Sequence, residues 1–156
     1  MDNVNSKVIS TLNDLVETAR DGRKGYETAA DAVDNPQMKT EFHRLAQQRA
    51  TFVSELERTA QSLGGSTANK TTLEGAALEA AGAVHRGWIN LKSAVGANDS
   101  KAILSECENG DAAALKAYDN ALHEKDLPVD VLTLIQRQKQ EIEAAKQTIT
   151  SLKQSL

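Results

Sequence analysis

The chain has 156 residues, which is the length of one ordinary domain and is enough to bury a hydrophobic core. Hydrophobic residues make up 40% and charged residues 26%, a balance that excludes wholesale disorder. The net charge of −4 provides no global positive field, so we expect no nucleic-acid partner and no membrane partner. A single cysteine, Cys107, excludes an internal disulfide and a multi-cysteine metal site.

Two further features concern the cellular compartment. No apolar run approaches the ~18 residues that a membrane span needs. The N-terminal residues lack the basic and apolar regions of a signal peptide. We therefore expect a cytoplasmic protein.

Prolines, glycines and polar capping residues divide the chain into five predicted helices. Pro36 and Pro128 each follow a polar turn and suit a first helical turn, where the amide hydrogen that proline lacks would be unpaired anyway. Gly64 signals a helix end before a polar loop, and Asp99 or Ser100 is a candidate helix cap. These breaks predict one domain over residues 1–156, with helices over residues 3–33, 36–63, 71–95, 99–123 and 128–155.

Four of these helices carry apolar residues at alternating spacings of three and four, as Met38, Phe42 and Leu45 do in the second. This pattern is typical of helices that cross at about 20° in a four-helix bundle. The helix over 71–95 has a weaker stripe, whose main anchor is Trp88. Its glycines lower its intrinsic helix propensity, so we expect it to depend on packing.

The chain also contains an internal repeat. The second and fifth predicted helices align without a gap, and the first and fourth align through Tyr26 and Tyr118. The repeat predicts two copies of one helical hairpin that pack together. The expected fold is therefore all-α: an antiparallel four-helix bundle of two helical hairpins, with an additional helix in the crossover connection.

Short motifs throughout the chain carry a resemblance to a known family. They are Leu12-Asn13-Asp14-Leu15, Asp21-Gly22-Arg23-Lys24-Gly25-Tyr26-Glu27, Gly64-Gly65, His85-Arg86-Gly87-Trp88, Glu106-Cys107-Glu108-Asn109-Gly110-Asp111 and Tyr118. With these motifs the chain resembles an uncharacterised bacterial family of ferritin-like four-helix-bundle proteins. The resemblance implies the ferritin-like form of the bundle, and it brings no assigned activity.

The ligand pattern of a ferritin-type di-iron centre is missing. Such a centre takes one Glu from each of two helices and a Glu-x-x-His pair from each of the other two. No glutamate stands three positions before His43, His85 or His123. We therefore expect no di-iron ligands, no cofactor and no catalytic residues. The alternative is a carboxylate-based site for iron or another divalent metal, with metal-binding or oxidoreductase activity, formed by Asp21, Glu27, Asp111 and Asp119.

Polar residues interrupt the apolar stripes near the middle of the bundle. Arg49, Asp111 and Gln138 occupy stripe positions, and the turns of the two hairpins would bring them into one layer. A buried guanidinium requires a carboxylate, because an unpaired buried charge is costly. We expect Arg49 to pair with Asp111, Gln138 to extend the pair, and Asp21 to be a second candidate at the layer's edge. The candidate flanking residues are Tyr26, Tyr118, Glu27 and Asp119.

The polar layer is expected to fix helix register and pairing, which is a known use of polar core residues. The function predicted from these features is non-catalytic, in binding or assembly. A homodimer or another protein is the candidate partner. Apolar residues off the main stripes would cover the helix over 71–95 or form a dimer face: Ile9, Val16, Leu115 and Leu132.

Overall fold

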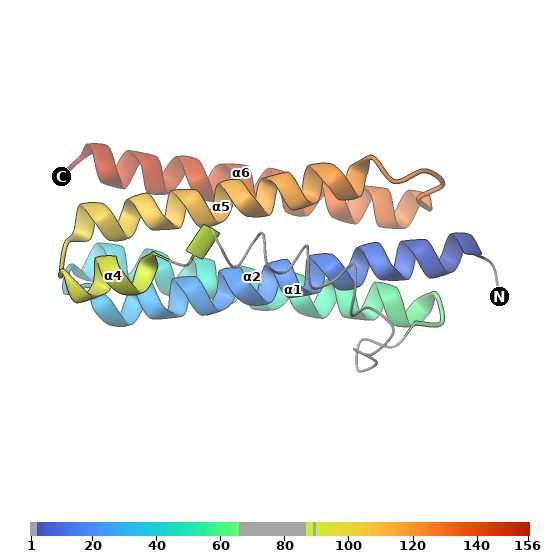
Figure 1. The fold of residues 1–156 in the computed structure, drawn as a ribbon, viewed down its shortest axis with the longest axis horizontal. Coiled ribbons are helices and arrows are strands. Elements are labelled where there is room, and N and C mark those ends of the chain that lie inside the picture. Colours follow the sequence, from blue (N-terminus) through green and yellow to red (C-terminus); the bar gives the residue numbers. More distant parts are fainter. Residues whose placement is uncertain (1–2, 66–86, 89) are drawn as a thin grey trace.

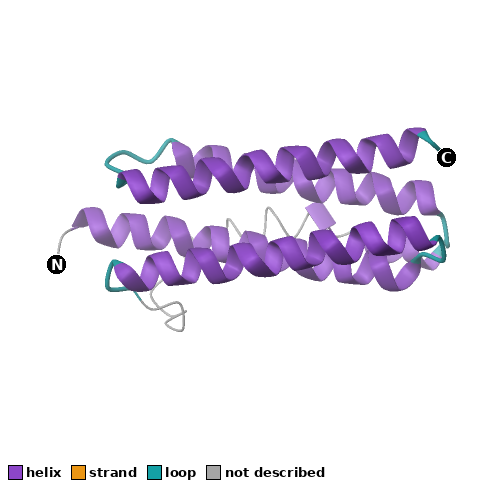
Figure 2. Cartoon of the chain, turned by 180° about the vertical axis from the view of Figure 1, so that it is seen from behind, coloured by secondary structure: helices purple, strands orange, loops and turns teal. Residues whose placement is uncertain are grey.

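The computed structural model describes residues 3–65, 87–88 and 90–156. The described residues form helices and no strand: α1 (Asn3–Ala32), α2 (Pro36–Ser62), α4 (Leu91–Gly96), α5 (Ser100–Leu122) and α6 (Val129–Gln154). Figure 1 shows α1 and α2 as one antiparallel hairpin, and α5 and α6 as a second hairpin packed beside it. The reverse view in Figure 2 shows the same four long helices along the whole length of the bundle.

Both ends of the four long helices agree with the predicted bounds to within one residue, and local capping explains two of the starts. The Asn35 side chain accepts a hydrogen bond from the Met38 amide at 3.1 Å, directly before Pro36 begins α2. Asp99 caps α5 in the same way, accepting from the Lys101 amide at 3.1 Å. These caps satisfy amide groups that have no partner within their own helix.

The third predicted helix, over 71–95, falls mostly on residues outside those that the structure describes, 71–86 and 89. Its described end is the short helix α4, which contacts α1 and α5 and leads into the turn before α5. Among the described helices, none has both the length and the apolar composition that crossing a bilayer would demand.

Buried apolar residues form two clusters, one in each half of the bundle. The first includes Phe42 and Trp88, and the second includes Phe52 and Ile135. Val16, one of the residues assigned to a dimer face or a helix cover, is 2% exposed and belongs to the second cluster. The other three, Ile9, Leu115 and Leu132, are half-buried.

Trp88 is wedged between α1 and α5. A Cβ atom built on Gly25 would lie 2.4 Å from the indole Cε3, and one built on Gly110 would lie 2.1 Å from Cε2. The ring therefore occupies a slot that exists only because both helices lack a side chain there. Tyr26 contacts the indole edge-on, with ring centroids 5.2 Å apart.

This slot predicts that Gly110→Ala displaces the indole. Alanine raises helix propensity by about 1 kcal/mol, but the overlap should outweigh this gain and lower the free energy of unfolding by about 1–2 kcal/mol. Urea unfolding followed by Trp88 fluorescence measures the change, since Trp88 is the protein's one tryptophan. Gly96→Ala is the matched control, because a Cβ there meets open space. Equal stability of the two variants would contradict the slot.

Candidate functional site

The centre of the bundle holds a buried ion pair. Arg49, from α2, donates from Nη1 to Oδ1 of Asp111, from α5, at 2.9 Å. The two side chains are 1% and 0% exposed, so the pair that the sequence predicted is fully removed from water. It lies between the two apolar clusters and links the two hairpins.

Gly22 of α1 makes room for this pair. A Cβ there would lie 2.9 Å from Nη1 of Arg49 and 3.3 Å from its Cγ. The guanidinium thus lies against helix backbone, where a larger residue on α1 would displace it.

Tyr26 provides the second hydrogen bond to the Asp111 carboxylate. Its hydroxyl donates to Oδ2 of Asp111 at 2.5 Å, while Oδ1 accepts from Arg49. The Arg49 Cζ also lies 5.2 Å from the centroid of the Tyr26 ring, within the range of a cation–π contact. Both oxygens of Asp111 therefore have donors, and its negative charge faces a fixed positive one.

Gln138 is buried but makes its hydrogen bonds outside the ion pair, contrary to the expectation that it would extend the pair. Its Oε1 accepts from the Tyr118 hydroxyl at 2.6 Å, and its Nε2 donates to Glu55 at 3.1 Å. Gln138 is therefore paired with Tyr118 and Glu55 rather than with Asp111.

The Gln138 pair connects to the surface through Glu55, which sequence reasoning missed. Glu55 accepts from Arg137 at 2.6 Å, and Arg137 also pairs with Glu141 at 2.8 Å. Glu55 thereby joins α2 to α6. Its one sequence signal is its place one residue before Leu56, an apolar stripe position.

The remaining predicted residues do not enter the buried layer. Glu27 is exposed and pairs with Arg23 at 2.9 Å, and the side chain of Asp119 is 50% exposed and pairs with Lys139 at 2.7 Å. Each follows a buried tyrosine by one residue, and one residue turns an α-helix by about 100°, which directs these carboxylates outward. Asp21 is half-buried at the flank of α1, because its neighbour Gly22 takes the inward position.

The four carboxylates of the alternative metal site therefore point in different directions. Within residues 3–65, 87–88 and 90–156, no three His, Cys, Asp or Glu side chains come together in a group suited to a metal ion. Asp111 alone of the four lies in the core, and Arg49 and Tyr26 already occupy its oxygens. This donor set does not fit iron or another divalent cation, which would need several free lone pairs.

Burial governs the ionisation of the core groups. It lowers the pKa of the Arg49 guanidinium, but the charge of Asp111, its hydrogen bond and the neighbouring tyrosines together outweigh this effect and leave that pKa raised overall. Burial, reinforced by Asp111, also raises the pKa of Tyr26 and of the Cys107 thiol well above their usual values. Burial likewise raises the pKa of Tyr118. Cys107 is thus a protonated, inert core residue at neutral pH.

A family model described as "Domain of unknown function (DUF2383)" matches residues 7–124. The chain belongs to this family. The match includes α2 and α5 and hence both members of the buried ion pair, and it ends before α6. No curated protein matched the sequence.

The ion pair predicts a distinctive pattern of stabilities. Arg49→Ala strands the Asp111 charge and should lower the free energy of unfolding by about 3–5 kcal/mol. A variant that combines Arg49→Leu, Asp111→Leu and Tyr26→Phe replaces the whole polar group with apolar side chains and should recover most of that loss. Urea unfolding of both variants and the wild type measures the difference. A triple variant less stable than Arg49→Ala would show that the polar group is not self-compensating.

The tyrosines predict the response to alkali. Tyr26 and Tyr118 are the only tyrosines, both are fully buried, and the pKa of each is raised. A raised folded-state pKa of a hydroxyl contributes stability that is present below the unfolded value of about 10 and is lost as the pH rises above it. Tyrosinate absorbance should therefore stay absent from the native protein near that pH and appear only with unfolding. In denaturant both residues should titrate normally; a native residue that did so would contradict their burial.

Proposed function

We propose that this protein is a non-catalytic, cytoplasmic helical bundle of the ferritin-like kind, in which an internal ion pair replaces the metal centre and whose role is binding or assembly. The observation that carries the proposal is the guanidinium of Arg49 against Asp111 at mid-bundle, with an N–O distance of 2.9 Å and both side chains buried. Metal-binding bundles direct their carboxylates and histidines to this central region.

Arginine is chemically unsuited to the work of a metal ligand. Its guanidinium has five donors and no acceptor and stays protonated, so it repels cations. It does supply what a divalent ion would otherwise supply to Asp111, a positive charge within contact distance. The pair therefore supports a structural centre that fixes how the two hairpins meet, and leaves the outer surface for function.

A carboxylate-based oxidoreductase is the weaker proposal. It needs Asp21, Glu27, Asp111 and Asp119 around one ion, whereas Glu27 and Asp119 form ion pairs on the outside of the bundle. Among the described residues, Asp111 is the only carboxylate whose side chain is fully buried.

A charge reversal tests the proposal. In Arg49→Glu a carboxylate faces Asp111, which should destabilise the bundle and create a site that divalent metal can fill. Added zinc or ferrous iron should then raise the melting temperature of this variant by mass action and leave that of the wild type unchanged. Thermal unfolding with and without metal, together with the rate of ferrous iron oxidation, measures both effects.

Arg49→Leu is the matched control, because it removes the charge without adding a metal ligand and should be destabilised without metal rescue. Stoichiometric metal in wild-type protein purified without chelator, or oxidation of ferrous iron above the buffer rate, would overturn the proposal in favour of the oxidoreductase.

A further inference from the structure

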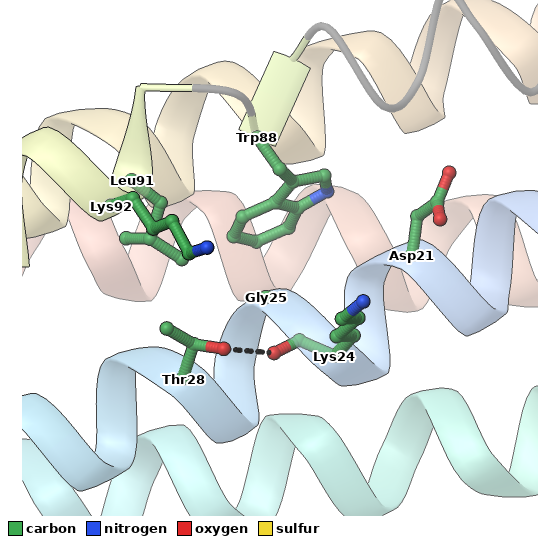
Figure 3. A pocket seen from close by; sticks show the side chains of 7 residues that line it. All are labelled: Asp21, Lys24, Gly25, Thr28, Trp88, Leu91 and Lys92. Atoms are coloured by element: carbon green, nitrogen blue, oxygen red, sulfur yellow. Dashed lines mark hydrogen bonds between the residues drawn. The ribbon is translucent and has the colours of Figure 1, made fainter.

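A surface cleft of about 280 Å³ lies between α1 and the segment that carries Trp88 and α4. Figure 3 shows its lining: Asp21, Lys24, Gly25 and Thr28 from α1 on one side, and Trp88, Leu91 and Lys92 on the other. The cleft is separate from the buried ion pair, because Gly22 and Arg49 are not among the residues that line it.

The cleft contains an unused hydrogen-bond donor. Trp88 is 7% exposed, and its Nε1 has no hydrogen-bond partner. The nitrogen itself is buried, and Figure 3 shows it on the side of the ring nearer to Asp21 and Lys24. A buried indole N–H normally finds an acceptor, since leaving it unpaired costs about 1–3 kcal/mol.

The charges of the lining favour an anion. Lys24 and Lys92 flank the indole from opposite sides, and both are exposed and form no ion pair with the described residues. Asp21, at one end, is already engaged within the chain. The lining therefore carries a net charge of +1 (two lysines and one aspartate) in a chain whose overall charge is −4.

The remaining lining is apolar or neutral. The Leu91 side chain and the indole provide the apolar wall, and Gly25, against which the indole packs, adds no side chain. The Thr28 hydroxyl donates to the Lys24 carbonyl at 2.9 Å, so its hydrogen is already committed. The donors left for a ligand are the two ammonium groups and the indole N–H.

From these features we propose that the cleft binds a small organic oxyanion, a carboxylate or phosphoryl group attached to a compact apolar body. The oxyanion accepts from Trp88 Nε1 and is neutralised by Lys24 and Lys92, and the apolar body lies against Leu91 and the indole. The flexible lysine side chains move aside as the ligand enters. The inference rests on the proposed binding function and names the class of molecule that is bound.

The experiment uses the indole N–H resonance of the full-length, ¹⁵N-labelled chain, because one tryptophan gives one indole cross-peak. Benzoate, phenyl phosphate, inorganic phosphate and the neutral benzyl alcohol are titrated separately. Benzoate or phenyl phosphate should move the cross-peak downfield and saturate with a Kd on the order of 1 mM or below. The tighter of the two distinguishes a carboxylate site from a phosphoryl site. Inorganic phosphate should bind more weakly, and benzyl alcohol should cause no downfield shift.

Charge variants locate the binding. Lys24→Gln with Lys92→Gln should raise the Kd by about fivefold or more, because it removes both cations from the cleft. The control variant combines Lys7→Gln and Lys116→Gln, two exposed lysines that do not line the cleft. It has the same net charge as the cleft variant and should leave the Kd unchanged. All four lysines are exposed, so both variants should fold like the wild type, as thermal unfolding will verify.

The proposal is overturned if no anion moves the indole cross-peak saturably, or if the two double variants weaken binding equally. Inorganic phosphate binding as tightly as phenyl phosphate would overturn the apolar part of the site. These outcomes are independent of the metal experiment, which reports on the centre of the bundle. A negative result for the cleft would thus not contradict the proposal of a metal-free centre. Metal binding by the wild type would not by itself explain a shift of the Trp88 cross-peak.

Discussion

The ion pair between Arg49 and Asp111 is the constraint on which this bundle depends. Apolar stripes alone let neighbouring helices slide by a turn with little change in the area they bury. A charged pair removed from water does not allow such slippage, because a shift would leave both charges without partners. Since Arg49 belongs to one hairpin and Asp111 to the other, the pair fixes how the hairpins meet.

Space for the charged layer and for the indole comes from glycines. Gly22 admits the guanidinium, and Gly25 and Gly110 admit Trp88 between α1 and α5. Tyr26 lies between these features, donating to Asp111 and contacting Trp88 edge-on. Tyr26 therefore contacts both the buried ion pair and the indole that forms one wall of the cleft.

The charged pair could be predicted because the spacing of a helical stripe shows which positions are buried, and the residue type shows which of those positions carry a charge. Arg49 and Asp111 occupy stripe positions, and a buried guanidinium has few acceptable neighbours. Gln138 occupies a stripe position too, but its partner, Tyr118, depends on how α6 lies along α5, which stripe spacing does not contain. The alternative metal site required Glu27 and Asp119 to point inward, whereas a single residue's rotation about the helix axis directs them to solvent.

The ends of the helices and their inward faces depend on interactions within a few residues. Caps such as Asn35 and Asp99, and the alternating three- and four-residue spacing, could therefore be recognised from the sequence alone. The position of one helix along its neighbour depends on contacts between residues that are distant in sequence. Only packing could therefore assign Tyr118 to Gln138, bring Glu55 to Arg137, and close α1 and Trp88 around a cleft with an unpaired indole N–H.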